Sequence, residues 1–162
     1  MQRIHYILAF LLFLIPNLGF CQGDMHRDMF HYEARNDVFI EAGAQEDLRS
    51  STLNLERQIA TGKWDNKVLL IRLGGGYSTP LTGIDYGFGG LAGLTMLTGQ
   101  SNHHFELGGG LFIGKIAKKA DPYYFGIPLI DFGYRYQKPD GGFLFRAKGG
   151  ILGYGLSFGY SF

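Results

Sequence analysis

Four side chains near the beginning of the chain could bind a soft metal ion. Met25, His26, Met29 and His31 lie in the polar leader 22–36, and thioether and imidazole groups together suit copper. Polar leaders of this kind are far more often solvated tails than metal sites. We therefore predict no metal site and no cofactor.

A glycine-rich stretch, "GFGGLA" at residues 87–92, formally fits the G-x-G-x-x-A pattern of dinucleotide-binding sites. In those sites the glycines follow a strand and open a helix, whose N-terminus binds the pyrophosphate. Here the stretch enters an alternating segment, and no helical period follows it. Nucleotide binding is therefore not expected.

The first 21 residues differ from the rest and indicate export. Arg3 provides a basic start, residues 7–15 ("ILAFLLFLI") an apolar stretch, and Gly19 with Cys21 a small-residue cleavage site. This pattern is typical of a cleaved signal peptide and is too short for a membrane-spanning helix. Cys21 is the one cysteine, and two outcomes stay open for it: removal with the signal peptide, or attachment of a lipid.

The charge balance argues against nucleic-acid partners. The chain has 15 Lys and Arg against 14 Asp and Glu, and Arg3 lies in the predicted signal peptide. Surfaces that bind DNA or RNA need an excess of basic residues. More informative are the 26 glycines, 14 phenylalanines and 10 tyrosines, because glycine at this frequency without a collagen repeat is unusual in helical proteins.

An alternation with period two recurs through most of the chain after residue 37 and predicts β-strands. We expect eight, at 38–46, 52–60, 67–79, 89–99, 103–116, 125–137, 142–150 and 153–162. No segment after the signal peptide shows a sustained helical period or a run of 18 apolar residues. The prediction is an all-β fold with one domain at 37–162: an eight-stranded antiparallel transmembrane β-barrel.

The connections between these strands alternate in character. "TGKWDN", "GQSN" and "KPDGG" are short and rich in turn formers, whereas "DLRSS", "PLTGIDYGF" and "AKKADPYY" are longer or more irregular. Short turns at one end and longer loops at the other are typical of outer-membrane barrels with both termini in the periplasm. The last connection, near residues 149–152, is shorter than an external loop usually is.

The two faces of the strands favour a membrane barrel over the alternative, a soluble antiparallel sandwich. One face carries large apolar side chains such as Ile130, Phe132 and Tyr134, and the other carries glycines and isolated charges. A soluble sandwich exposes a polar face rich in Lys, Glu, Ser and Thr, whereas a small barrel is filled by its inward side chains. We expect the inward charges to pair, since unpaired charges there would be costly. The predicted structural network comprises Glu41, Glu56, Arg72, Glu106, Asp131, Arg135, Arg146 and Lys148.

Several stretches resemble the small outer-membrane β-barrel proteins of Gram-negative bacteria: "LNLERQ", "IRLGGGYS", "FELGGG", "GYRYQ" and "LSFGYSF". The resemblance covers about residues 37–162. It implies location in the cell outer membrane, contact with its lipid and lipopolysaccharide, and insertion by the outer-membrane assembly machinery. In that family a last strand with a C-terminal aromatic is the assembly signal, which implies this role for Tyr160 and Phe162. Because the family mostly lacks an established activity, the resemblance implies fold and location more than mechanism.

The expected role is structural or interactive rather than enzymatic. Some outer-membrane barrels modify lipids with a Ser or His at the rim. The predicted external side of this chain offers Ser50, Ser51, Ser78, Thr79 and Asp85, while all five histidines fall in the signal peptide, the leader or the periplasmic turn at His103 and His104. Nucleophile and base would then lie on opposite sides of the membrane.

Two further possibilities concern transport and external ligands. A narrow passive pore for small solutes is the alternative function, although inward side chains such as Glu106, Arg135 and Arg146 should block the bore. An unknown ligand could bind the external loops, where Lys118 and Lys119 precede Tyr123 and Tyr124. That combination could contact lipopolysaccharide phosphates, or these could be ordinary rim residues.

Overall fold

The computed structural model describes residues 34–45, 48–61, 67–79, 87–99, 102–116, 123–151 and 153–162. Regular structure in these ranges consists of strands: β1 (Asn36–Gln45), β2 (Leu48–Thr61), β3 (Lys67–Ser78), β4 (Gly87–Thr98), β5 (His103–Ile116), β6 (Tyr123–Gln137), β7 (Gly142–Gly150) and β8 (Gly153–Ser161). The predicted signal peptide and residues 22–33 of the leader lie outside the described residues. Within those ranges there is no helix of sufficient length and apolar character to cross a membrane.

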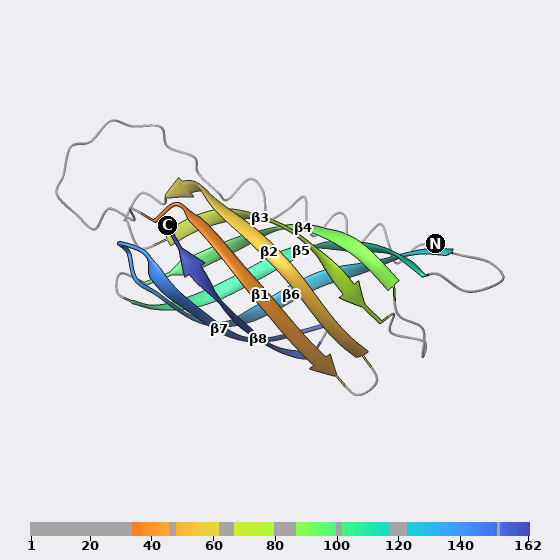
Figure 1. Cartoon of the computed structure of the whole chain (residues 1–162). Helices are drawn as coiled ribbons and strands as arrows, with labels where there is room; N and C mark the ends of the chain where they lie inside the picture. Colours follow the sequence, from red (N-terminus) through yellow and green to blue (C-terminus); the bar gives the residue numbers. More distant parts are fainter. Residues whose placement is uncertain are drawn as a thin grey trace, which may run out of the picture.

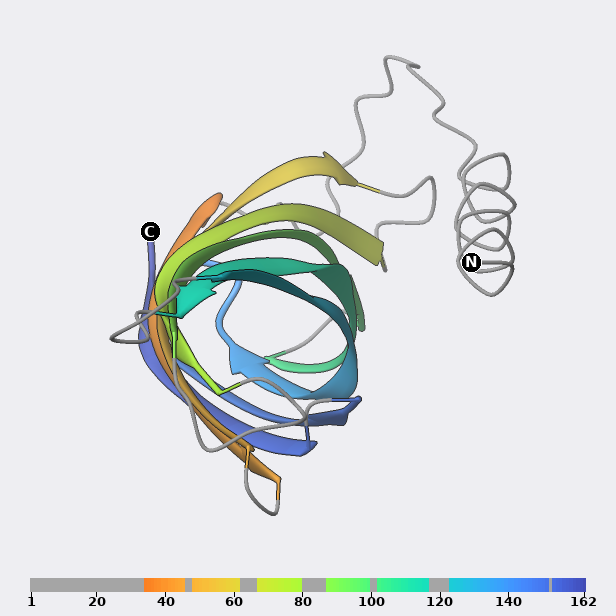
Figure 2. The ribbon, with the colours of Figure 1, turned by 90° about the vertical axis from the view of Figure 1, so that its right-hand side faces the viewer.

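Each strand pairs antiparallel with the next one along the chain, and β8 pairs with β1 to close the sheet. Figures 1 and 2 show the resulting barrel from the side and from one end. At the seam, Asn36 N donates to Phe162 O at 2.9 Å and Phe162 N donates to Asn36 O at 2.8 Å. Closure leaves no long unpaired edge around most of the sheet. The predicted all-β fold, an eight-stranded antiparallel barrel, is confirmed.

The first connection requires a correction. "DLRSS" was expected to form a longer or irregular loop, but β2 begins at Leu48, so residues 46 and 47 alone separate β1 from β2. Serine is common in turns, yet Ser50 and Ser51 here lie opposite Gly43 and Ala42 of β1. The ladder between the two strands provides the backbone partners that a loop would have to find elsewhere.

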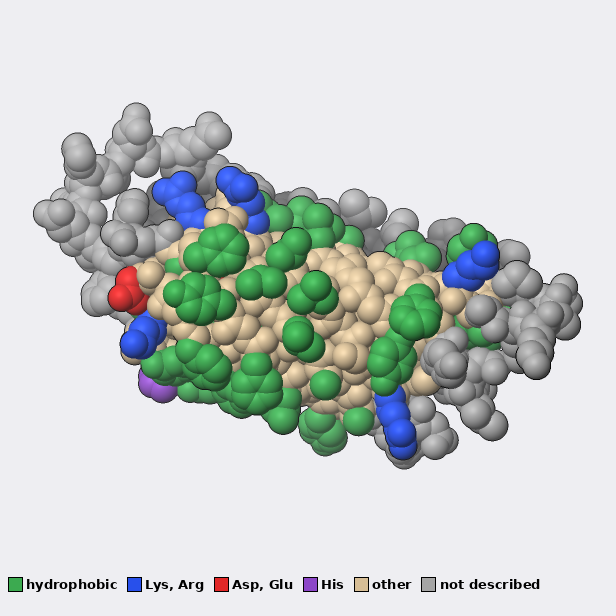
Figure 3. Space-filling model, viewed as in Figure 1, with side chains coloured by type: hydrophobic (Ala, Val, Ile, Leu, Met, Phe, Trp, Pro, Cys, Tyr) green, Lys and Arg blue, Asp and Glu red, His purple; other side chains and the backbone are tan. Residues whose placement is uncertain are grey.

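Alternate residues of each strand face the inside and the outside of the barrel. In β8, Gly155, Ser157 and Ser161 are buried, whereas Tyr154 and Phe158 are exposed. Outward apolar side chains cover the middle of the barrel, with basic side chains near both ends of the view in Figure 3. The outward bases of the described strands are Arg49, Arg57, Lys67 and Lys115.

The interior is layered along the barrel. At the end where β3 begins, Val68, Leu70 and Leu97 form a buried apolar cluster. At the other end a second cluster, called here the apolar wall, comprises Leu91, Phe112 and Ile127 with Phe125 and Leu129 packed against it. The charged residues lie between these layers. The inner face therefore carries more large apolar side chains than the expected pattern of glycines and isolated charges.

The strands differ in length. β5 and β6 have 14 and 15 residues, whereas β7 and β8 have nine each. β7 pairs with β6 only along residues 131–137. Residues 123–130 of β6 therefore have β5 on one side and no described strand on the other. Figure 1 shows the β7–β8 hairpin ending short of the β5–β6 hairpin.

Candidate functional site

The charged residues predicted to face inward all lie inside the barrel and contact one another. They come from β1, β2, β3, β5, β6 and β7, so that the network joins strands from around the whole sheet. These residues form two groups of ion pairs. Arg146 links the groups, because it lies close to Glu56 in one and to Glu41 in the other. The arrangement ties the barrel together across its bore.

The first group is centred on Arg135 of β6, which has an exposed fraction of 0%. Its Nε donates to Glu106 Oε2 at 2.8 Å, and its Nη2 donates to Glu56 Oε2. Arg146 of β7 also donates to both carboxylate oxygens of Glu106. Two buried guanidinium groups thus share one carboxylate, which keeps each charge paired away from water.

The second group lies nearer to the apolar wall. Lys148 Nζ is 3.0 Å from Glu41 Oε1 and 2.5 Å from Asp131 Oδ2. Arg72 Nη2 donates to Glu41 Oε2 at 2.9 Å, and Arg72 Nη1 lies 3.9 Å from Asp131 Oδ2. We call these four residues the charged quartet. It has two cations and two anions and therefore no net charge.

One acid of the interior is absent from the predicted network. Asp37 is buried, accepts hydrogen bonds from Gln137 Nε2 at 2.8 Å and from Ser161 Oγ, and lies 3.4 Å from Arg135 Nη1. The predicted barrel domain begins at Asp37 but its first predicted strand begins at residue 38, so the predicted network does not include Asp37. Its parity with Glu41 was the signal that could have found it, because residues 37, 39 and 41 share one face of a strand.

Neutral side chains complete the hydrogen bonding of the network. Asn54 Oδ1 accepts from Arg72 Nε at 3.1 Å, Thr95 Oγ1 donates to Glu56 Oε1 at 3.0 Å, and Ser157 Oγ donates to Glu41 Oε2 at 3.2 Å. Phe39 also faces inward, with the guanidinium carbons of Arg146 and Arg72 at 4.4 and 5.3 Å from its ring centre. A cation over an aromatic face is attracted by the ring quadrupole.

Among the described residues, three buried side-chain atoms lack a hydrogen bond: Gln58 Oε1, Asp131 Oδ1 and Arg146 Nη1. Arg146 Nη1 nevertheless lies 3.6 Å from Glu56 Oε1 and 3.9 Å from Glu41 Oε2. The network is therefore charge-paired at nearly every described position. Its geometry is suited to holding strands together.

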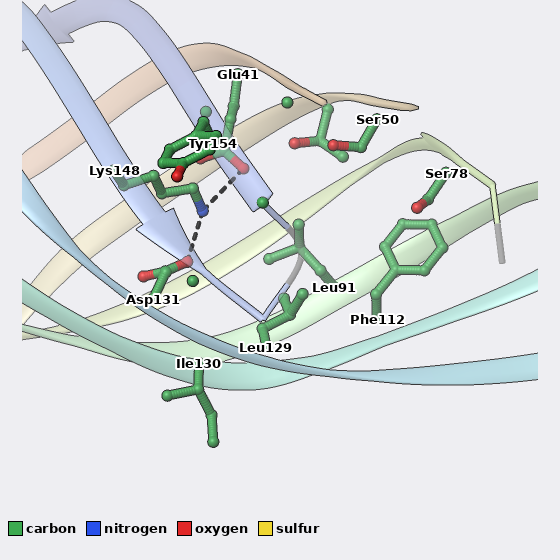
Figure 4. Close-up of a pocket in the computed structure, with 15 residues that line it drawn as sticks. Glu41, Ser50, Ser78, Leu91, Phe112, Leu129, Ile130, Asp131, Lys148 and Tyr154 are labelled. Carbon is green, nitrogen blue, oxygen red and sulfur yellow. Dashed lines mark hydrogen bonds and ion pairs between the residues drawn. The ribbon is translucent and has the colours of Figure 1, made fainter. Parts of the chain in front are cut away.

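A pocket lies between the charged quartet and the apolar wall. Its floor includes Glu41, Asp131 and Lys148, and its empty volume is about 530 Å³, counting the part that is open to solvent. Figure 4 shows Lys148 between the two carboxylates, with Leu91, Leu129 and Phe112 grouped beside them. Ser50, Thr52 and Ser78 add hydroxyl groups to the lining.

The described hydroxyl candidates and the two described histidines lie at opposite ends of the barrel. Ser50 pairs with Ser78 where β2 begins and β3 ends, and Thr79 Oγ1 accepts a hydrogen bond from Arg49 N at 2.9 Å. Asp85 lies outside the described residues. His103 and His104 instead begin β5, beside the end of β6. The described residues therefore bring no histidine to these hydroxyls.

The two histidines face opposite sides of the sheet. His103 is exposed, and its Nδ1 lies 2.6 Å from Tyr134 Oη, whereas His104 is buried with its Nε2 3.3 Å from Gln137 O. Within the described ranges, no three His, Cys, Asp or Glu side chains form a group that could hold a metal ion. Met25, His26, Met29 and His31 lie outside those ranges.

No family model, no curated protein and no solved structure matches this chain.

Proposed function

We propose that this chain is an integral β-barrel of the cell outer membrane, with a packed, charge-paired lumen and a structural or interaction role in the envelope. The observation that carries the proposal is the reversal of the usual distribution: a network of paired charges is buried inside, and large apolar side chains are exposed outside. Water-soluble proteins rarely expose so continuous an apolar surface. A hydrocarbon environment makes both features favourable.

The outer surface supports this proposal in detail. Leu53 and Leu55 of β2, Leu73 of β3, and Phe105 and Ile113 of β5 are each more than half exposed. The outward side chains of β5 between His103 and Lys115 include no charged residue. Nine to eleven tilted strand residues are enough to cross a hydrocarbon core. Interfacial aromatics such as Tyr134 and Tyr160 fit the girdle of such a barrel.

In the proposed orientation, the start of β1 and the end of β8 both lie on the periplasmic side. Tyr160 and Phe162 point outward at that end, with exposed fractions of 57% and 59%, and we assign them to recognition by the assembly machinery. At the opposite end, Lys115 Nζ lies 5.7 Å from the ring centre of Tyr124. This rim fits contact with outer-membrane lipid and lipopolysaccharide. Lys118 and Lys119 lie outside the described residues.

The first test is location and heat-modifiable migration. The protein should occur in the outer-membrane fraction, and an unheated sample in SDS should migrate differently from a boiled one, because a closed barrel resists unfolding until it is heated. A protein that stays in the soluble periplasmic fraction and shows no shift would contradict the proposal.

A further inference from the structure

The wall of the barrel is incomplete beside β6 in the part that the structure describes. β6 residues 123–130 pair with β5, but β7 reaches only to the level of Asp131, where Asp131 lies opposite Gly150. One further hydrogen bond, from Ile151 N to Ile130 O at 3.1 Å, marks the point on β6 where the gap begins. Beyond this bond, the side of β6 that faces away from β5 has no strand partner among the described residues.

The composition of that edge is unsuited to pairing with another strand. The backbone N–H and C=O groups of successive strand residues point alternately to the two neighbouring strands. In β6, Ile130 O accepts from Ile151 N on the β7 side, and Gln137 N donates to Asn102 O on the β5 side. The even-numbered residues of β6 therefore direct their backbone groups toward the gap. Pro128 is one of them and has no N–H to donate. Proline is a common means of preventing strand addition at an edge.

The gap connects the outer surface to the pocket. Ile130 points outward from the barrel wall (Figure 4) and yet borders the pocket, together with Gly150 at the end of β7 and Gly153 and Tyr154 at the start of β8. Ile130, Ile151 and Tyr154 are exposed. Behind them lies the apolar wall. Apolar side chains therefore lie on both the outer and the inner side of the wall at this gap.

The inner part of this path is polar but carries no net charge. The charged quartet at the floor pairs each cation with carboxylates at 2.5 to 3.9 Å. It therefore offers little attraction to an ionic ligand. The hydroxyls of Ser50 and Ser78 point into the same space (Figure 4) and can exchange hydrogen bonds with an uncharged group.

We propose that this side opening binds a single-chain amphiphile with an uncharged, hydroxyl-bearing head, of the monoacylglycerol class. The head lies against the floor beside Ser50 and Ser78. The hydrocarbon chain follows Leu129 and leaves the barrel past Ile130 and Pro128 into the surrounding lipid. This inference rests on the proposed function, since it requires a bilayer beside the gap.

Native mass spectrometry of the purified protein in detergent micelles tests the site, with monoolein, oleic acid and oleylamine added separately. We expect a saturable one-to-one adduct with monoolein. Ser50→Phe, which fills the pocket, should lower the adduct about tenfold. Ser51→Phe is the matched control, because Ser51 follows Ser50 but faces outward, and it should leave the adduct unchanged.

A second variant covers the case in which Ser50→Phe fails to fold. Ser50→Ala removes the hydroxyl with little change of shape and should lower the monoolein adduct about fivefold, the equivalent of one hydrogen bond. The proposal is overturned by an equal adduct in the wild type and both Ser50 variants, or by stronger binding of oleic acid or oleylamine. A stable dimer without a monoolein adduct also overturns it and would assign the β6 edge to strand pairing.

The heat-dependent shift in SDS separates failure of this inference from failure of the proposed function. If the shift is present and the adduct is absent, only the ligand site is wrong. If the shift and the outer-membrane location are both absent, the proposed function is wrong as well.

Discussion

Arg135 is the residue at which most contacts of the interior converge. Its guanidinium group contacts Glu56, Glu106 and Asp37, and its Nη1 also donates to Gln137 Oε1 at 3.1 Å. These partners come from β1, β2, β5 and β6. A buried carboxylate that loses its cationic partner cannot be stabilised by hydration instead, because the side chains that fill the barrel exclude water.

We therefore predict that Arg135→Met strongly destabilises the barrel. Three carboxylates would lose a direct partner, and removing one member of a buried ion pair typically costs about 3–5 kcal/mol. The measurement is the free energy of unfolding in urea, for protein in detergent micelles. Arg57→Met, at an exposed outward position near the rim, is the control and should change that free energy little. Equal, small effects of the two substitutions would show that the network contributes nothing.

At the scale of strands, small residues let β4 and β5 approach closely on the inner face. A methyl group added at Gly93 of β4 would lie 2.5 Å from Gly109 O and 3.1 Å from the Cα of Gly110. At Gly109 of β5, which faces outward, the nearest atom would be Leu129 O at 3.9 Å. The two glycines lie on adjacent strands but meet different steric limits.

This difference predicts opposite tolerance to a larger side chain. Gly93→Val should lower the free energy of unfolding by about 1–3 kcal/mol, the usual range for overpacking, because a backbone carbonyl cannot move aside without shifting a strand. Gly109→Val should be tolerated, since valine favours strands and has space there. Urea titrations of both variants, together with their yields of heat-modifiable protein, measure this difference. A Gly93→Val barrel as stable as the Gly109 variant would contradict it.

At the scale of the whole molecule, the layers of side chains inside the barrel determine whether a solute can pass through its bore. An eight-stranded barrel has a bore just wide enough to be filled by side chains. Arg135 and Arg146 lie fully buried in it, and the cluster of Val68, Leu70 and Leu97 lies toward the end where β3 begins. The side opening beside β6 leads to a pocket with a charged floor rather than to the other end of the barrel.

We therefore predict no stable ion conductance for the purified protein in planar lipid bilayers. The charges of the bore are paired with one another, so the passage of an ion would require several contacts to break together. Single-channel recording at both signs of voltage is the measurement, and a known porin in the same bilayers is the control. Discrete, reproducible channels would favour the alternative of a narrow passive pore.

The sequence was sufficient for the features that depend on local alternation. Because successive strand residues point to opposite faces, the parity of Glu41, Arg72 and Arg135 placed them together on the inner face before any contact was known. The same argument predicted the outward position of Phe132 and Tyr134. Strand number and antiparallel order followed from the spacing of the turns.

The partners of those residues were decided by register and closure. Asp37 and Arg135 are 98 positions apart in the chain and meet only because β8 returns to β1 and the strands are staggered around the barrel. Alternation assigns a face to a residue, but it carries no information on height along the bore. It also could not reveal that Phe39 would contact the guanidinium groups of both Arg72 and Arg146, since the same period is compatible with many packings.

The unpaired edge of β6 likewise depends on the tertiary structure. The sequence predicted a short last connection, and the short hairpin that it closes leaves residues 123–130 of β6 without a described neighbour on one side. Whether Pro128 lies in a paired strand or at an edge depends on where the adjacent hairpin ends. Local sequence determined which side chains face inward and outward, because the period of a strand is two. The relative shift of strands distant in the chain determined which charges meet and where the wall opens, because each shift must satisfy the closure of all eight strands at once.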